Sequence, residues 1–269
     1  MMRSCRYRPD DAAIRARIAS SPPADARIQS RGRLLGGVLG CLLAVALLRT
    51  AQGQDEWTRF RGPDGTGVSH AKTIPIRFDE ADYRWNVELP GKGHSSPVLW
   101  GDKLFLTCEA GDDKQRFVVC LDAGEGRVLW TWKEAFEEYR SHRFNSFAAS
   151  TPAVDAERVY VSWVSGTTFI VLALDHEGNP LWHRSMGDFK ARFGPGASPI
   201  VLDGVVIMGN DHAGDTSFLI GLDAKTGETR WKLPRTSGMA SYVTPAVYRP
   251  ETGPPELIFV SPSHGVTGL

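Results

Sequence analysis

One short stretch of the 269-residue sequence gathers side chains that can hold a metal ion. It reads Asn210-Asp211-His212-Ala213-Gly214-Asp215 and offers two carboxylates and an imidazole. These groups are suitable ligands for divalent transition metals. The stretch also lies between two apolar runs that we expect to be strands, where polar hairpin loops are common. We therefore favour a plain loop and predict no metal site.

The sequence offers no clear candidate for nucleophilic catalysis. Its seven His residues are scattered, and no Ser/His/Asp triad or Cys/His pair can be assigned from their order. Four cysteines are present: Cys5 and Cys41 near the N-terminus, and Cys108 and Cys120 on two strands of one expected hairpin. An exported chain could form a disulfide between the second pair. We favour two small buried thiols instead. Neither belongs to a Cys-x-x-Cys or Cys/His metal pattern.

The overall charge excludes one class of partner. The chain has 31 basic and 31 acidic side chains. A nucleic-acid-binding protein needs a clustered excess of Lys and Arg. We therefore expect no nucleic-acid partner.

The first 53 residues have the order of an export signal. Residues 1–33 are polar and Arg-rich, and we expect a disordered leader. Residues 34–48 form an uncharged apolar run, and small residues follow up to Gly53. This order is typical of a secretory signal peptide with its core and cleavage region in 34–53. An uncleaved anchor helix is the alternative, and it would give the only membrane contact; Cys41 lies inside the apolar run, which disfavours lipidation. We expect localisation in the periplasm or cell envelope.

Residues 54–82 are predicted to form an irregular N-terminal arm, because Glu56 to His70 is rich in Gly and polar residues. Trp57 and Phe60 would anchor the arm to the domain. Arg59 and Arg61 could bind an anion, but we favour a structural role for this segment.

A unit of roughly fifty residues repeats through residues 83–269. Each unit opens on a Pro-containing strand, continues with an apolar strand and closes with a hairpin that leads to a Trp. The opening Pro residues are 55, 47 and 46 positions apart. The units cover about 95–130, 150–182, 198–231 and 243–269, and the last one is incomplete. Four short strands per unit at this period predict an all-β fold, a partial β-propeller of about four four-stranded blades.

Two further expectations follow from the repeat. Tyr83 to Leu89 alternates like a single strand, and we expect it to complete the last blade of a ring. The fourth unit breaks off inside a strand pair, so we expect the sequence to be a fragment of a longer protein with more blades.

The loops that lead into the blades would surround the mouth of an axial channel. Alignment of the units on their Pro residues places His94 and Tyr242 there, with Arg143, Asn145 and His142 nearby. A polar, partly enclosed mouth can bind a ligand or a peptide. A solvated funnel with nothing bound is the alternative. His94, Arg143, Asn145 and Tyr242 are our candidate binding residues.

The hairpins carry one motif, roughly Ala-x-Asp-x-x-Thr-Gly-x-x-x-Trp. In this motif Asp accepts hydrogen bonds from turn amides, Gly allows a positive φ, and Trp fills the seam between blades. We assign a structural role to the matching residues: Asp122, Trp130, Asp175, Trp182, Asp223, Gly227 and Trp231.

The motif resembles the PQQ-like β-propeller repeat. Three short segments, at 57–63, 93–97 and 145–148, look like those of a bacterial exported subgroup of these propellers. That subgroup is often labelled as similar to the propeller lipoprotein of outer-membrane assembly. The resemblance implies that a quinoprotein dehydrogenase would use a bound Ca²⁺, a carboxylate base and a disulfide between adjacent Cys residues over the quinone. This sequence has no adjacent Cys pair and no group of Asp, Glu or Asn residues whose spacing indicates a Ca²⁺ site. We expect no cofactor; PQQ is implied by the resemblance alone.

The resemblance leaves three functions open. The first is a non-catalytic exported propeller scaffold that binds a protein partner or envelope component through its loops and channel mouth. The second is a PQQ-dependent quinoprotein oxidoreductase whose catalytic residues lie in a missing C-terminal part. The third is the sensor portion of a larger signalling protein. We favour the first and lean against an enzyme.

Overall fold

The computed structural model describes residues 56–269. The predicted leader (1–33), the signal-peptide region (34–53), Cys5 and Cys41 lie outside these residues. The described part consists of β-strands and one short 3-10 helix, η1 (Glu80–Asp82). Within residues 56–269, no helix has the length and apolar character needed to cross a membrane.

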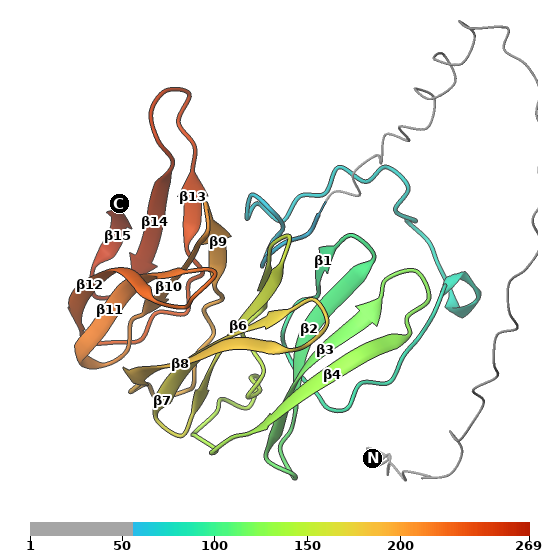
Figure 1. The fold of residues 1–269 in the computed structure, drawn as a ribbon, viewed down its shortest axis with the longest axis horizontal. Helices are drawn as coiled ribbons and strands as arrows, with labels where there is room; N and C mark the ends of the chain where they lie inside the picture. Colours follow the sequence, from blue (N-terminus) through green and yellow to red (C-terminus); the bar gives the residue numbers. More distant parts are fainter. Residues whose placement is uncertain (1–55) are drawn as a thin grey trace, which may run out of the picture. The chain divides into compact units, whose positions relative to one another are not determined.

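The strands form four antiparallel sheets in chain order (Figure 1). Three sheets have four strands and the last has three, so the predicted blades with an incomplete fourth are confirmed. Blade 1 contains β1 (Val98–Trp100), β2 (Lys103–Ala110), β3 (Gln115–Asp122) and β4 (Val128–Ala135). Blade 2 contains β5 (Ala153–Val154), β6 (Arg158–Ser165), β7 (Thr168–Asp175) and β8 (Pro180–Asp188). Blade 3 contains β9 (Ile200–Leu202), β10 (Val205–Asn210), β11 (Gly214–Asp223) and β12 (Thr229–Ser237). Blade 4 contains β13 (Ala246–Tyr248), β14 (Glu256–Ser261) and β15 (Gly265–Gly268).

Each turn between the third and fourth strands is organised by its Asp. The Asp223 carboxylate accepts the backbone N–H groups of Lys225 and Thr226 at 2.9 Å each. Gly227 follows with φ of +73°, a conformation that Gly adopts without steric cost. Asp122 and Asp175 accept two turn amides each in the same way. The predicted turn chemistry is therefore present in all three hairpins.

The fourth strands differ from the prediction. The sequence suggested that each of these strands ends at its Trp. In the structure, β4, β8 and β12 continue for five or six residues beyond Trp130, Trp182 and Trp231. The cause is the length of the neighbouring third strand, because its backbone groups need partners along their whole run.

Tyr83 to Leu89 forms no ladder among the described residues, and its expected role in completing the last blade of a ring stays a prediction. Val87 and Leu89 instead pack on an apolar face of blade 1 formed by Cys108, Val119 and Leu121. An isolated bridge between Lys92 and Glu109 follows this segment.

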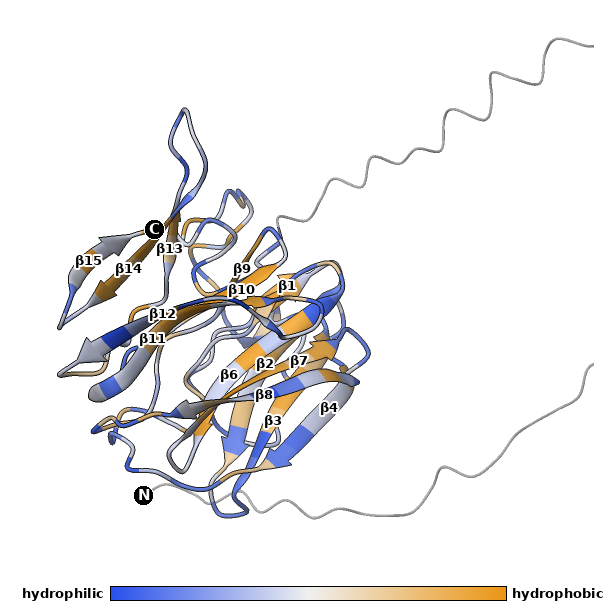
Figure 2. Cartoon of the chain, turned by 60° about the vertical axis from the view of Figure 1, so that its left-hand side comes forward, coloured by the Kyte–Doolittle hydropathy of each residue, from blue (hydrophilic) through white to orange (hydrophobic). Residues whose placement is uncertain are grey.

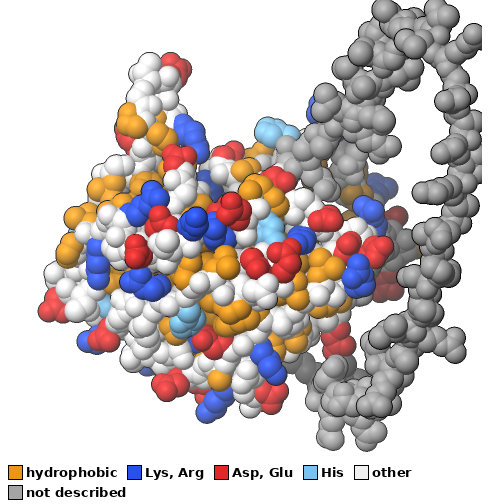
Figure 3. Space-filling model, in the orientation of Figure 1, with side chains coloured by type: hydrophobic (Ala, Val, Ile, Leu, Met, Phe, Trp, Pro, Cys, Tyr) orange, Lys and Arg blue, Asp and Glu red, His pale blue; other side chains and the backbone are white. Residues whose placement is uncertain are grey.

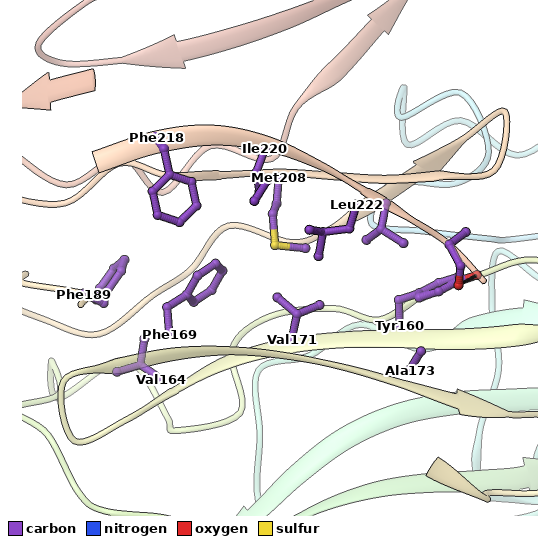
Figure 4. Packing of buried hydrophobic residues seen from close by; sticks show 12 residues of the cluster. Tyr160, Val164, Phe169, Val171, Ala173, Phe189, Met208, Phe218, Ile220 and Leu222 are labelled. Carbon is purple, nitrogen blue, oxygen red and sulfur yellow. Dashed lines mark hydrogen bonds between the residues drawn. The ribbon is translucent and has the colours of Figure 1, made fainter. Parts of the chain in front are cut away.

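The hydrophobic core lies between consecutive blades. Phe169, Val171 and Tyr160 of blade 2 face Met208, Phe218, Ile220 and Leu222 of blade 3 (Figure 4). Similar clusters join blade 1 to blade 2 and blade 3 to blade 4. Figure 2 shows that the inner strands carry most of the hydrophobic stretches, whereas β4, β8 and β12 are more polar. Burial of each large aliphatic side chain contributes about 1.5–3 kcal/mol.

Cys108 and Cys120 are buried and free. Cys108 packs on the face of blade 1 that carries Val87 and Leu89, whereas Cys120 packs in the seam with blade 2. Their side chains therefore point to opposite faces of one sheet, which excludes a disulfide between them. Burial raises the pKa of Cys108 to about 11 and that of Cys120 to about 12.

The N-terminal arm pairs with the innermost strands. The carbonyl oxygens of Trp57 and Thr58 accept the N–H groups of Leu99 in β1 and Val154 in β5, at 2.9 and 2.8 Å. Arg59 is buried, and its Nε donates to the carbonyl oxygens of Gly62 and Pro63. Arg59 thus holds the arm's own turn together, as expected for a structural role.

Candidate partner-binding rim

The loops that lead into the four blades are joined by one repeated hydrogen bond. The residue before each opening Pro donates its backbone N–H to the hydroxyl of the equivalent residue in the next blade. The bonds run from Ser96 to Thr151, from Thr151 to Ser198 and from Ser198 to Thr244, at 3.0, 3.0 and 3.1 Å. Because β1, β5 and β9 are also neighbours, this series holds the connector loops (residues 89–97, 136–152, 189–199 and 238–245) at one end of the blades.

Two of the candidate residues stabilise the loop before blade 2. His94 Nδ1 lies 2.9 Å from the Ser146 hydroxyl, which links the first connector loop to the second. The Asn145 side-chain oxygen accepts the N–H of Ser146 at 2.9 Å. The His94 side chain is exposed. The structure therefore brings His94 and Asn145 together, with part of their hydrogen-bonding capacity used by the loop itself.

The other two candidates contact two Phe residues that the sequence analysis did not single out. Tyr242 donates its hydroxyl to the carbonyl oxygen of Phe193 at 3.1 Å. Partial burial raises the pKa of Tyr242, so it is a neutral donor. Arg143 lies over the ring of Phe144 at 4.4 Å, and Phe144 is 70% exposed.

Phe193 is the centre of a cationic and aromatic group. The guanidinium carbons of Arg192 and Arg140 lie 5.1 and 5.5 Å from its ring centre. The His142 ring meets it edge to face at 4.9 Å and also contacts the Phe144 ring. We call this group the rim and define it by its members: Arg140, His142, Arg143, Phe144, Arg192, Phe193 and Tyr242.

A sequence signal for the rim exists. The dipeptide Arg-Phe occurs at the same stage of two successive connector loops, as Arg143-Phe144 and Arg192-Phe193. Comparison of the loops, rather than of the hairpins, would have found it. Beside the rim, Tyr139, Arg140, Lys190 and Gly194 line a cleft of about 320 Å³. Burial raises the pKa of Tyr139, so this hydroxyl is also neutral.

The segment Asn210 to Asp215 is not the plain loop that we expected. Asn210 ends β10, Gly214 begins β11, and Asp211 and His212 between them are buried. His212 Nδ1 accepts the backbone N–H of Lys190, and the Asp211 carboxylate lies 3.4 Å from Arg235 Nε. Desolvation lowers the pKa of His212. The loop before blade 3 and the strand β12 cover this segment, which explains its burial.

Metal ligation has no geometric support in residues 56–269, where no three His, Cys, Asp or Glu side chains are grouped as an ion would require. Figure 3 shows basic and acidic side chains interspersed over the face in view.

The family profile described as "Outer membrane protein assembly factor BamB" matches residues 44–250. The chain belongs to this family. The match covers more than half of the sequence and all of blades 1 to 3, so the resemblance to PQQ-like propeller repeats is confirmed.

Two curated proteins with sequence similarity to the chain are dehydrogenases. Quinohemoprotein alcohol dehydrogenase ADH IIB of Pseudomonas putida is 26% identical over 216 residues, 73% of this chain and 30% of the relative. Polyvinylalcohol dehydrogenase of a Pseudomonas species is 25% identical over 201 residues, 68% of this chain and 29% of the relative. The chain thus spans less than a third of either relative.

Solved structures similar to the chain come from both groups. Quinohemoprotein alcohol dehydrogenase of Comamonas testosteroni matches with a TM-score of 0.49 at 22% identity. The match covers 69% of this chain and 28% of the dehydrogenase chain. BamB of Moraxella catarrhalis matches with a TM-score of 0.43 at 22% identity. The match covers 68% of this chain and 52% of the BamB chain.

The described residues do not fit the quinone site that the resemblance implies. That site has an adjacent Cys pair over the quinone, whereas Cys108 and Cys120 lie in two separate cores. We therefore derive no reaction step through this cofactor.

Proposed function

We propose that this protein is an exported, non-catalytic propeller scaffold that binds a protein partner of the cell envelope through the rim. One observation carries the proposal: three Arg side chains and one His surround two Phe rings on adjacent connector loops. Arg and aromatic residues are the side chains enriched at protein–protein interfaces and their hot spots. A partner segment with acidic and apolar side chains would complement them.

The family supports the envelope setting. Its description names outer-membrane protein assembly, a task that proteins perform on other proteins in the envelope. Export through the predicted signal region at 34–53 would deliver the chain there. His94 and Asn145 would support the rim by holding the second connector loop, and Arg143 and Tyr242 would contact the partner.

Site-specific photo-crosslinking tests the proposal. A photoreactive amino acid replaces Phe144 in the full chain, and a matched control replaces Lys225, which is exposed at the β11–β12 turn. That turn lies at the opposite end of the blade from the connector loops, since β12 runs between the two ends. We expect one discrete envelope protein to crosslink at position 144 and none at position 225.

Charge reversal provides the second arm. Arg143→Glu and Arg192→Glu should each lower the crosslinking yield at position 144 roughly tenfold, because like charges at an interface suppress association. Equal yields at positions 144 and 225, or yields that ignore both substitutions, would refute the proposed role of the rim.

A quinoprotein oxidoreductase is the second candidate, since both curated relatives are dehydrogenases. This candidate places the catalytic residues outside the 269 residues of the chain. Dye reduction with alcohols or sugars, after addition of PQQ and Ca²⁺ to the protein encoded by the complete gene, separates the two functions. Turnover that depends on both additions supports the oxidoreductase; absence of turnover supports the scaffold.

A further inference from the structure

The cleft beside the rim lies over the β6–β7 turn of blade 2, between the second and third connector loops. In the second loop, the Glu137 N–H donates to the Ser165 hydroxyl at 2.8 Å, and the Glu137 carbonyl oxygen accepts the N–H of Gly166 at 2.7 Å. In the third loop, the Phe189 N–H donates to the carbonyl oxygen of Thr167 at 2.7 Å. The turn therefore holds both loops, and the cleft between them has fixed walls.

The ring of Tyr139 forms one wall of this cleft. It meets the Phe147 ring edge to face at 4.9 Å. It also lies so close to Gly194 that a methyl group at position 194 would overlap it. No hydrogen bond within residues 56–269 uses the Tyr139 hydroxyl, which is therefore a neutral donor that a ligand can engage.

Two cationic side chains come to the cleft from its two loops. Arg140 belongs to the second connector loop and Lys190 to the third, and together they outnumber Glu138, the acidic residue of the lining. Lys190 Nζ lies 3.1 Å from Asp188 Oδ2, but the Lys190 side chain is 60% exposed, and exposed ion pairs of this kind contribute little to stability. Both cations can therefore turn to a bound anion.

The floor of the cleft is apolar. Val164 and Phe189 line it, and both are buried in the core between blades 2 and 3. Every lining residue lies between positions 138 and 194, on blade 2 and the two loops beside it. We call this cleft the Tyr139 cleft.

We infer that the Tyr139 cleft binds the C-terminal residue of another polypeptide, with a free carboxylate and an apolar side chain. The carboxylate accepts hydrogen bonds from Arg140, Lys190 and the Tyr139 hydroxyl. The side chain lies on Val164 and Phe189. A C-terminal residue carries both groups on one Cα atom, whereas an internal Asp or Glu offers only a carboxylate on a short stem. Capture of a terminal carboxylate is a recurring mode of peptide recognition.

Arg140 connects the cleft to the rim, because its guanidinium carbon also lies 5.5 Å from the Phe193 ring centre. The polypeptide is therefore the partner that the proposed function places on the rim, and in this respect the inference rests on that function. The two can fail separately. Binding of a short peptide in the cleft without a crosslink at position 144 would reject the rim and keep the cleft. The reverse result would reject the cleft and keep the rim.

A pair of tetrapeptides tests the inference. The probe is acetyl-Gly-Ser-Ser-Leu with a free carboxylate, and the matched control is the same peptide with a C-terminal amide. Each is titrated into the full chain, and binding is measured by calorimetry. We expect the amide to bind at least about tenfold more weakly, because it loses the charge-assisted hydrogen bonds. A probe that ends in Ser should also bind roughly tenfold more weakly, because it leaves the apolar floor uncovered.

Variants of the protein show whether the cleft is the binding site. Tyr139→Phe removes only the free hydroxyl and should weaken binding of the probe roughly tenfold, the effect of one lost hydrogen bond to a charged group. Lys190→Gln should weaken it by a similar factor and should leave the weak binding of the amide nearly unchanged. Lys225→Gln, at the exposed turn at the other end of blade 3, is the control and should bind the probe as the parent does.

Four results would overturn the inference. The first is no heat of binding at the highest soluble concentration of the probe. The second is equal affinity for the free acid and the amide. The third is unchanged binding to Tyr139→Phe and Lys190→Gln, which would place the peptide elsewhere. The fourth is equally tight binding of acetyl-Gly-Ser-Glu-Ser-amide, which would assign the carboxylate to an acidic side chain instead of a chain end.

Discussion

The guanidinium carbon of Arg116 lies 4.5 Å from the ring centre of Trp163, across the seam between blades 1 and 2. The same group lies 5.0 Å from the Phe136 ring, and its Nη1 donates to the carbonyl oxygen of Val164 at 3.2 Å. Arg116 is almost fully buried, and desolvation lowers its pKa to about 10. The buried Arg116 side chain of blade 1 therefore contacts Trp163 and Val164 of blade 2 and joins the two blades.

Arg116→Lys should destabilise the protein by about 1–2 kcal/mol. An ammonium group is more strongly hydrated than a guanidinium and cannot stack flat on two rings. Urea unfolding of the full chain measures the change. Arg127→Lys, at an exposed position beside Glu125, is the control and should leave the midpoint unchanged; equal midpoints for both variants would contradict the bridging role.

Gly227→Ala should cost more stability than Gly204→Ala, by about 1 kcal/mol or more. Both residues have φ near +70°, so both substitutions carry the backbone strain of a left-handed conformation. A methyl group at position 227 would also lie 2.6 Å from Trp182 Cδ2, whereas position 204 has no atom within 4 Å. The difference between the two unfolding free energies thus isolates the contact with Trp182. Identical losses would show that strain alone matters.

The stability that Asp223 contributes should disappear at low pH. Its hydrogen bond to Arg230 and the turn amides lower the pKa of Asp223 to about 2, whereas an unfolded Asp has a pKa of about 3.9. The contribution is therefore complete above about pH 4 and is lost as the pH falls toward 2. Asp223→Asn should be less stable than the parent at pH 6, and the gap should close by about pH 2.

Urea midpoints at several pH values test this dependence. Asp203→Asn, at an exposed turn on the same blade, serves as the matched control and should show a gap that does not change in this way. A gap for Asp223→Asn that is constant with pH would mean that the carboxylate charge is unimportant for the turn.

Cys108 and Cys120 should resist alkylation in the folded protein. Both thiols are buried, and burial raises their pKa to about 11 and 12, so the reactive thiolate is scarce and inaccessible. Peptide mass spectrometry after iodoacetamide treatment should find both unmodified without denaturant and both modified in guanidinium chloride. A mass shift for a bond between them under oxidising conditions would contradict their placement on opposite faces.

Several features of the fold could be predicted from the chain because they depend on local chemistry. The Asp and Gly of each turn, the strand alternation and the fifty-residue period indicate four antiparallel units whatever their neighbours are. The segment Tyr83 to Leu89 depends on more than local chemistry. Its alternating pattern indicates an extended segment, but a ladder needs a partner strand, and no strand pairs with it among the described residues.

The rim likewise has a part that the sequence could predict and a part that depends on how the blades pack. Residue types and spacing placed His94, Arg143, Asn145 and Tyr242 on connector loops, because that position follows from the repeat. The contacts of Phe193 could not be found in this way, since its neighbours Arg140, His142 and Tyr242 come from two other connector loops and meet it only when the blades pack in order.

The amino-acid sequence by itself determined the all-β repeat, the blade register and the turn chemistry of this protein, because hydrogen bonds and allowed φ angles act over a few residues. The tertiary structure alone decided which Trp lies on which Gly, why Asp211 and His212 are buried, and that Tyr139, Arg140 and Lys190 line one cleft. Those relationships depend on the side chains of one sheet meeting the next, and no residue pattern within a single blade encodes its neighbour's surface.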